Sequence, residues 1–537
     1  MAAWEAFLAS ENFRNLMKKL DEIALFKNVS SSWLALGVNI CVGIFISPYI
    51  LHHLGDEAFG LWVLIFSITG YYGLFDLGIR SSIVRYVAAY SATRDYTELS
   101  RLLSTALLGY SGIGALAIFI TLGGSFFVDS IFRVPADFLH TARLLFLIVG
   151  TAVALGFPAG IFGGVLEGLQ RFYLLNSTSI CATMMRALLI VLALRHGYGL
   201  LMVALITVSM PLISGLVNAV IVLSILPVRL SLGNVNRETV RRIANYSSST
   251  LIILVASRLR FKTDALVIGT FVSSAAITYF TIGSRLVEYA GEVVTGLAQV
   301  FVPMSSKSDA TGDLAGLRKI FVAGNRACAF IIFPISATLI ILGKSVIEAW
   351  VGPRYVATSY PVLLVLVLPY TFFMAQGASG RVLFGMAKHR TLSFVVLLEG
   401  SANVFLSIFL VRRFGILGDA FGTAIPLLCT TMFFLPRHLC RQLKLSVAMY
   451  LRKAYLLPLA LCVPQVAVLV LMRHWFVAHN YFQLAIQLGA GGAVYGVGLF
   501  WAIWTRKAWQ VEGIHDLDTA NQVAADLIET YQREEEV

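Results

Sequence analysis

Long apolar segments alternate with short polar connections along almost the whole chain. An apolar run of about 18 or more residues can cross the hydrocarbon core of a bilayer as an α-helix. Segments of this kind recur near residues 29–51, 58–79, 99–123, 139–163, 173–194, 199–226, 246–269, 275–302, 320–342, 358–380, 391–411, 417–436, 454–472 and 481–504. The pattern predicts an all-α polytopic membrane protein with about fourteen transmembrane helices.

The composition supports this class and excludes others. The 537 residues are 58% hydrophobic, and only 13% of them are charged. A soluble catalytic domain needs about 50 residues or more, and no hydrophilic segment reaches that length. We therefore expect a membrane protein that is not an enzyme and that uses no cofactor.

The net charge raises the question of a nucleic-acid partner, because it is +12 at neutral pH. The basic residues gather in alternate short loops, as at 80–101, 229–242 and 437–453, whereas the intervening loops carry few. Membrane-protein loops rich in Lys and Arg stay in the cytoplasm. We therefore expect both termini in the cytoplasm and no nucleic-acid partner.

The ends of the chain and the cysteines add no further chemistry. Residues 1–27 combine apolar and basic side chains as a cytoplasmic interfacial amphipathic helix does, and residues 506–537 form an acidic cytoplasmic tail. The six cysteines lie in or beside apolar segments without Cys-x-x-Cys spacing, which is typical of reduced thiols. We expect no metal site.

The transmembrane region contains an internal duplication. Three matches share a shift of 217 residues: Asn28-Val-Ser-Ser-Ser with Asn245-Tyr-Ser-Ser-Ser, Arg101 with Arg318, and Val165-Leu166-x-Gly168 with Val382-Leu383-x-Gly385. Each match is weak alone, but three at one shift are hard to obtain by chance. Because each half has an even number of spans, the halves are expected to be parallel repeats with a substrate site at their interface.

The duplication defines the expected domains. A first six-helix bundle covers 28–228, a second covers 229–445, and two extra transmembrane helices cover 446–505. The predicted architecture is two six-helix repeats around a central cavity plus these two C-terminal helices.

Ionisable residues within apolar spans are the candidates for function, because burying a charge in a bilayer costs about 3 kcal/mol. In span 246–269, Arg258 and Lys262 share one helix face, and Arg260 and Asp264 share nearly the opposite face. The last two can partly neutralise each other, whereas the first two need a cavity, another helix or an anionic ligand. Snorkelling of Lys262 and Asp264 to the interface is an open alternative.

The duplication offers a control for this feature. The positions that match these four charges in the first half are Cys41, Gly43, Phe45 and Ser47. None of them is ionisable, so the fold does not require the charges in both halves. This difference favours a functional interpretation of the second-half cluster.

A second charged stripe lies in span 275–302. Arg285, Glu288 and Glu292 follow at spacings of three and four, so they share one helix face. A structural Arg285–Glu288 pair and a carboxylate that exchanges protons or sodium are both open. Asp76, Arg186 and Glu399 are further intramembrane charges for which helix pairing and substrate binding remain alternatives.

Several motifs resemble a known family. Asn28-Val-Ser-Ser-Ser-Trp33, the segment Leu54-Gly-Asp-Glu-Ala-Phe-Gly-Leu-Trp62 and Phe75-Asp-Leu-Gly-Ile79 are similar to those of polysaccharide-biosynthesis, O-antigen type flippases. This branch belongs to the multidrug/oligosaccharidyl-lipid/polysaccharide exporter superfamily, and the resemblance covers about residues 25–505.

The resemblance implies a function. It implies that an undecaprenyl-diphosphate-linked oligosaccharide moves from the inner to the outer leaflet of the bacterial cytoplasmic membrane by alternating access. Membrane lipids are implied partners, and a proton or sodium ion and polysaccharide polymerase or assembly proteins are open ones. We assign substrate binding to the basic candidates and ion coupling or pairing to the acidic ones. The basic candidates are Arg258, Arg260, Lys262, Arg285 and Arg186, and the acidic ones are Asp76, Asp264, Glu288, Glu292 and Glu399.

Two other functions remain as alternatives. A cation-coupled multidrug antiporter of the same fold would favour acidic and aromatic lining, which the basic cluster opposes. A membrane-embedded polysaccharide polymerase or ligase would need a sizeable outer loop for its chemistry, and the outer loops here are short. The diphosphate of a lipid-linked sugar is anionic and suits bidentate Arg contacts, which favours the flippase.

Overall fold

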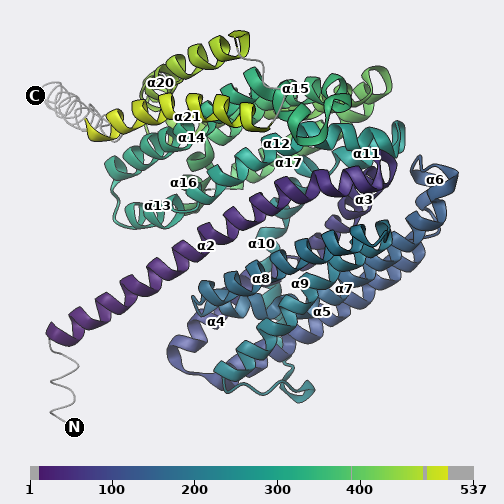
Figure 1. Cartoon of the computed structure of the whole chain (residues 1–537). Coiled ribbons are helices and arrows are strands. Elements are labelled where there is room, and N and C mark those ends of the chain that lie inside the picture. The colour runs from purple at the N-terminus through teal and green to yellow at the C-terminus, as the bar shows by residue number, and fades with distance from the viewer. Residues whose placement is uncertain (1–10, 389, 476–480, 506–537) are drawn as a thin grey trace, which may run out of the picture. The chain divides into compact units, whose positions relative to one another are not determined.

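The computed structural model describes residues 11–388, 390–475 and 481–505. The first ten residues and the predicted acidic tail lie outside this part. Within it the backbone forms helices and no β-strand (Figure 1). The chain divides into two compact units. Unit 1 comprises Met1–Arg258 and Ser273–Ile277, and unit 2 comprises Leu259–Val272 and Thr278–Val537.

Twelve helical segments cover the described chain from Glu11 to Phe261. They are α2 (Glu11–Leu54), α3 (Asp56–Gly70), η1 (Tyr71–Asp76), α4 (Ile79–Thr93), α5 (Tyr96–Gly124), α6 (Val128–Ile131), η2 (Ala136–Phe138), α7 (Leu139–Gly168), α8 (Phe172–Arg195), α9 (Leu200–Ile225), η3 (Leu232–Asn234) and α10 (Arg237–Phe261). The division falls inside α10, between Arg258 and Leu259.

The remaining helices complete the chain. They are α11 (Asp264–Phe271), α12 (Ser274–Ala298), α13 (Phe301–Ala310), α14 (Leu314–Val351), η4 (Pro353–Tyr355), α15 (Val356–Ala375), α16 (Gly377–Gly385), α17 (Arg390–Phe414), α18 (Ile416–Leu428), η5 (Cys429–Phe434), α19 (Leu435–Gln442), α20 (Val447–Trp475) and α21 (Tyr481–Trp504). The segment η5 is a π-helix between α18 and α19.

Two helix boundaries in the structure differ from those predicted from the sequence. The boundary expected at residue 27 falls inside α2, which runs as one helix from Glu11 to Leu54. The span expected as continuous at 246–269 is broken, because α10 ends at Phe261 and α11 begins at Asp264. No Gly or Pro marks this break in the sequence.

Twelve helical segments within the described residues are long and apolar enough to cross a membrane. Twelve of the fourteen predicted spans correspond to them. The other two, 246–269 and 275–302, carry the charge clusters, which lower their hydropathy. The protein is therefore a multi-pass helical membrane protein, and the number fourteen stays a prediction.

Helix bounds recur at the shift found in the sequence. The short η2 and η4 begin at Ala136 and Pro353. In the first half α7 then ends at Gly168, and in the second half α15 and α16 follow, of which α16 ends at Gly385. Just after these ends, Gln170 and Ala387 both adopt positive φ, at 56° and 54°. The local structure at these positions of the first half thus recurs 217 residues later in the second half. Superposition of the two whole halves stays a prediction.

The two matched glycines have the same packing role. A Cβ on Gly168 would lie 2.8 Å from the backbone oxygen of Val84, and one on Gly385 would lie 2.9 Å from that of Val302. Each helix end therefore approaches another helix backbone too closely for a side chain. This close approach explains why both copies of the Val-Leu-x-Gly motif end in glycine.

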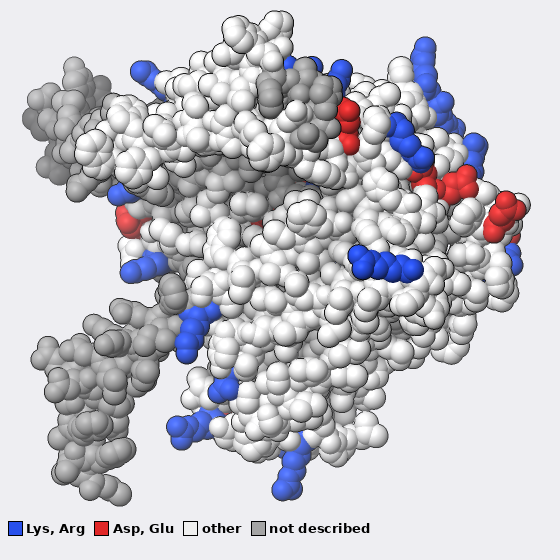
Figure 2. All heavy atoms as spheres, in the orientation of Figure 1, with Lys and Arg blue, Asp and Glu red and all other residues white. Residues whose placement is uncertain are grey.

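Apolar side chains fill the interior of each unit and also cover much of its surface, as expected of a protein in lipid. In unit 1, residues of α5 and α7 such as Leu102 and Val165 form an apolar core. In unit 2, Phe321 of α14 stacks on Tyr450 of α20 with ring centroids 4.4 Å apart. Large apolar side chains are also exposed, including Phe45 at 73% and Phe119 at 72%. The face drawn in Figure 2 is mostly uncharged, with basic side chains in scattered groups.

Candidate functional site

The break between α10 and α11 is capped by side chains. The last carbonyls of a helix lack partners within the helix. The hydroxyl of Thr263 donates to the carbonyl of Leu259 at 2.9 Å. The amide of Asn403, on α17, donates to the carbonyl of Arg260 at 3.3 Å. The helix can therefore stop inside an apolar region because polar side chains replace its next hydrogen bonds.

Arg260 forms a buried ion pair at this break. Its guanidinium donates to the carboxylate of Glu399 on α17 in a very short contact. The side chains of Arg260 and Glu399 are only 7% and 2% exposed. The guanidinium also lies 4.8 Å from the ring centroid of Phe373. Arg260 is thus neutralised by Glu399, and the expected Arg260–Asp264 pair does not form.

Asp264 instead joins a chain of neutral polar groups. Its carboxylate accepts a hydrogen bond from the hydroxyl of Thr423 on α18 at 3.0 Å. That hydroxyl oxygen in turn accepts from the amide of Asn403, also at 3.0 Å. This chain ties the start of α11 to α17 and α18.

Asp419 is a second buried carboxylate in the same region, which sequence reasoning missed. It is fully buried on α18, and its two carboxylate oxygens accept no hydrogen bond from the described residues. Its backbone carbonyl accepts from the hydroxyl of Ser407 at 3.3 Å, and that hydroxyl lies 3.4 Å from the side-chain oxygen of Asn403. The signal in the sequence is weak, because Asp419 lies at the very start of the expected span 417–436, closely after Arg412 and Arg413.

A buried carboxylate without a partner is costly in an apolar interior. A proton or a bound cation removes this cost. Hard cations prefer oxygen ligands. Carboxylate, amide and hydroxyl oxygens are available here from Asp264, Asn403, Ser407, Asp419 and Thr423. No group of three or more His, Cys, Asp or Glu suited to a metal occurs within the described part of the chain.

The charged stripe of α12 is more open. Arg285 donates to Glu288 at 2.8 Å, and their side chains are 41% and 34% exposed. Glu292 and Lys262 are exposed and make no hydrogen bond or ion pair with the described residues. Arg285 and Glu288 therefore form an ion pair, and Glu292 and Lys262 are accessible.

Arg258 belongs to unit 1 and has different surroundings. Its side chain is half-buried and forms no hydrogen bond or ion pair with described residues. A Cβ on Gly73 of η1 would lie 2.6 Å from Nη2 of Arg258. The missing side chain of Gly73 thus leaves space for the guanidinium. Of the three cations predicted on α10 and just after it, only Arg258 lies in unit 1.

The other unit 1 candidates do not join Arg258. Asp76 accepts a very short hydrogen bond from the hydroxyl of Tyr110, whose ring stacks on Phe157 at 6.1 Å. Arg186 is half-buried on α8 without an ion pair to a described residue. Asp76 therefore has a hydrogen-bond partner, whereas Arg186 pairs with no acid among the described residues.

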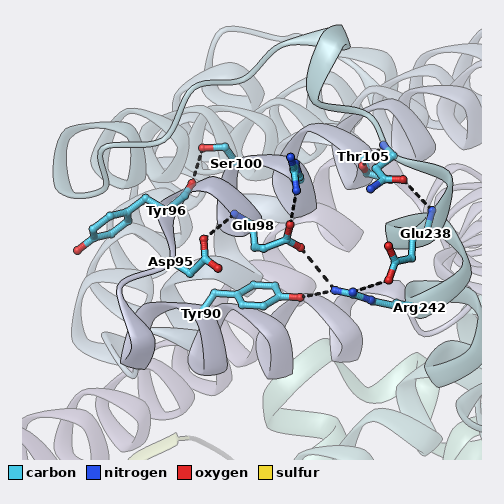
Figure 3. Close-up of polar contacts among 10 residues, drawn as sticks. Tyr90, Asp95, Tyr96, Glu98, Ser100, Thr105, Glu238 and Arg242 are labelled. Atoms are coloured by element: carbon cyan, nitrogen blue, oxygen red, sulfur yellow. Dashed lines mark hydrogen bonds and ion pairs between the residues drawn. The ribbon is translucent and has the colours of Figure 1, made fainter.

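An exposed ion cluster lies at the other end of α10. Arg242 donates to Glu238 at 2.6 Å and to the hydroxyl of Tyr90 at 3.0 Å, and it approaches Glu98 at 3.5 Å (Figure 3). The hydrogen bond to Glu238 raises the pKa of Arg242. Glu98 also pairs with Arg101 at 2.5 Å. The cluster links the start of α10 to α4 and α5.

Comparisons with known proteins agree with this description. The family model described as polysaccharide biosynthesis protein matches residues 25–309. The uncharacterized membrane protein EpsK of Bacillus subtilis (strain 168) is 23% identical over 77% of this chain and 83% of its own length. A protein of Shigella flexneri with the name "Putative O-antigen transporter" is 20% identical over 70% of this chain and 88% of its own.

A solved structure shares the fold. The lipid II flippase MurJ in an inward closed conformation superposes with a TM-score of 0.66 at 18% identity. The match covers 91% of this chain and all of the other. Because the family model matches more than half of the sequence, the chain belongs to the polysaccharide biosynthesis protein family.

Proposed function

We propose that this protein flips an undecaprenyl-diphosphate-linked oligosaccharide from the inner to the outer leaflet of the bacterial cytoplasmic membrane by alternating access. The observation that carries the proposal is membership in the polysaccharide biosynthesis family over residues 25–309. The fold shared with a lipid II flippase and the name of the Shigella relative support it. Both termini are proposed to face the cytoplasm.

Arg258 is the proposed contact for the anionic diphosphate. A guanidinium recognises phosphate oxygens with two parallel hydrogen bonds. Arg258 is half-buried, has no carboxylate partner within the described residues, and rests against Gly73 rather than against an acid. Arg260 is a poorer candidate than the sequence suggested, because Glu399 already neutralises it. Lys262, Arg285 and Arg186 are proposed to add positive charge along the path.

The carboxylates of unit 2 are proposed to couple transport to a proton or sodium gradient. Asp419 is buried, and its carboxylate accepts no hydrogen bond from the described residues. It lies on α18 one turn before Thr423, which donates to Asp264. Two like charges in an apolar region favour uptake of a counter-charge. Binding and release of that charge would alter how α11, α17 and α18 pack together. Glu292, which is exposed, and Glu288, which is 34% exposed beside Arg285, would exchange it with water.

Substitution of Arg258 tests the substrate role. Arg258→Gln should keep normal membrane abundance and abolish surface display of the polysaccharide, because no buried carboxylate loses its partner. Arg258→Lys keeps the charge without the planar fork, so it should retain part of the activity. Gly73→Ala should lower export without removing charge, because its Cβ displaces the guanidinium. The matched control is Arg133→Gln, which removes an exposed charge from the same unit.

The measurement is polysaccharide on the cell surface of a flippase-deficient strain, divided by protein abundance in the membrane. Normal export by a well-expressed Arg258→Gln variant would exclude the diphosphate contact. Disappearance of that variant from the membrane would instead indicate a structural role for Arg258.

A cation-coupled multidrug antiporter is the second candidate. One observation favours it: unit 2 gathers more acidic than basic charge around α11. The acids are Asp264, Glu288, Glu292, Glu399 and Asp419, and the bases are Arg260, Lys262, Arg285 and Arg412, which lies over the ring of Phe271. Acidic lining suits organic cations. Increased resistance to cationic dyes on expression, without any effect on surface polysaccharide, would favour this function over the flippase.

A further inference from the structure

A long apolar groove lies within unit 2, and its lining includes none of the acidic residues described above. Its volume is about 900 Å³, and α14, α15, η5, α19 and α20 line it. Its walls are mainly aliphatic and aromatic, as with Phe333, Leu368 and Leu456. Leu456, Leu459 and Val463 are 58%, 51% and 66% exposed, so the groove is open along the α20 flank.

The groove runs along four turns of α20. Arg452, Leu456, Leu459, Val463 and Val466 line it from the start of that helix inward. These positions span about 21 Å at 1.5 Å per residue. One leaflet of a bilayer core is about 15 Å deep, so an extended hydrocarbon chain fits along the groove.

Two polar donors that line the groove have partners within the protein, whereas the side-chain oxygen of Gln376 accepts no hydrogen bond from the described residues. The amide of Gln376 donates to the carbonyl of Thr431 at 2.6 Å. The hydroxyl of Thr371 donates to that of Ser336, also at 2.6 Å. An apolar occupant would therefore leave these two donors satisfied, and the aliphatic and aromatic walls favour such an occupant over a sugar or a peptide.

The end of the groove at the start of α20 carries a basic residue. Arg452 lines it, is exposed, and makes no hydrogen bond or ion pair with the described residues. The surrounding sequence carries Arg437, Arg441, Lys444 and Lys453, and it contains no Asp or Glu between Asp419 and Glu512. This end should therefore attract an anion strongly.

The start of α20 is held firmly in place. The guanidinium of Arg326 on α14 is buried and donates through Nε to the carbonyl of Lys453 at 2.8 Å. The neighbouring Arg452 is thereby presented at a fixed point at the end of the groove. A basic pocket between transmembrane helices at the cytoplasmic surface is the arrangement that binds anionic lipid headgroups.

We propose that this groove binds an anionic phospholipid of the cytoplasmic leaflet. One acyl chain lies between α14, α15 and α20, and the phosphate contacts Arg452. The occupant enters sideways from the bilayer, because the groove is open along α20. The site lies within unit 2 alone and uses α20, which lies outside the duplicated spans, so it does not depend on the proposed transport substrate.

Photolabelling of the purified full-length protein tests the site. The probe is phosphatidylglycerol with a diazirine in its acyl chain, and labelled peptides are identified by mass spectrometry. We expect labels on the segments around 368–376 and 452–466. Zwitterionic phosphatidylcholine with the same diazirine should label them less. Arg452→Gln should lower phosphatidylglycerol labelling about fivefold and leave phosphatidylcholine labelling unchanged.

A pair of leucines on the same helix provides the matched control. Leu459 lines the groove and is 51% exposed, whereas Leu471 lies outside it and is 56% exposed. Leu459→Trp should fill the groove and remove the label, and Leu471→Trp should not. Equal labelling by both lipids, or labelling that ignores Arg452 and Leu459, would overturn the proposal. Labelling by a polyprenyl phosphate probe but not by phosphatidylglycerol would also overturn it, in favour of a substrate-tail site.

Discussion

Two arginines of the same helix form ion pairs of opposite character. The side chain of Arg242, near the start of α10, is 43% exposed, and it forms an ion pair with Glu238, which is 65% exposed. Arg260, near the end of α10, is 7% exposed, and its partner Glu399 is 2% exposed. Both are good hydrogen-bonded pairs, yet their surroundings differ. The comparison teaches that burial, rather than geometry, decides what the loss of one partner costs.

The physical reason is solvation. An exposed pair exchanges interactions with water for interactions with its partner, and salt screens it, so it contributes about 0–1 kcal/mol. A buried pair has already lost its water. Removing one member leaves a charge in an apolar region, which costs about 3–5 kcal/mol. The buried pair therefore constrains the fold near α11, and the exposed pair only adjusts it.

The largest effect is expected at the buried pair. Arg260→Gln leaves Glu399 uncompensated and should destabilise the protein by about 3–5 kcal/mol, seen as low membrane abundance and a lower melting temperature. The double substitution Arg260→Met with Glu399→Leu removes both charges and should recover most of the stability. A single Arg260→Gln variant as stable as the parent protein would contradict the comparison.

Asp419 should behave differently from Glu399, although both are buried acids. The carboxylate of Asp419 has no hydrogen-bond partner within the described residues, so Asp419→Asn should preserve folding. It should instead remove the stabilisation that the bound coupling ion gives to the folded protein. That stabilisation is about 2.7 kcal/mol when the free ion concentration is one hundred times its Kd. Melting temperatures with and without sodium, and across pH, measure this effect. Asp309→Asn, an exposed acid in the same unit, is the control. Retention of the full ion response would exclude Asp419 from the site.

A smaller effect is expected at the exposed cluster. Arg242→Gln should cost less than about 1 kcal/mol, and the difference from the parent protein should shrink in high salt. Thermal unfolding at low and high salt measures it. A loss as large as that of Arg260→Gln would mean that the cluster in Figure 3 holds the start of α10 far more strongly than its exposure indicates.

The smallest effect is expected at Asp129. Its hydrogen bond with Arg143, at 2.8 Å, holds the pKa of Asp129 below its ordinary value. A depressed pKa in the folded state contributes stability above the pKa of the unfolded state, and this contribution is lost as pH falls through the folded pKa. Arg143→Gln should therefore lower stability slightly at neutral pH and not at acid pH. A pH-independent difference would show that the pair is not responsible.

The sequence by itself determined much of the fold. Apolar segments long enough to span a bilayer identified a helical membrane protein, because hydropathy and length are local properties. The shift of 217 residues recurs in helix bounds such as Gly168 and Gly385, since matched sequences favour matched local structure. The sequence also indicated that span 246–269 carries unusual charges.

Only the tertiary structure decided what those charges do. Helical spacing shows which side chains share a face, but it cannot show which helix lies opposite. Arg260 meets Glu399, 139 residues away, and Asp264 meets Thr423, 159 residues away. Asn403 also caps a helix break that has no local signal in the sequence. Partners so distant in sequence are selected by packing, because burial makes each buried charge depend on whichever polar group the fold brings beside it.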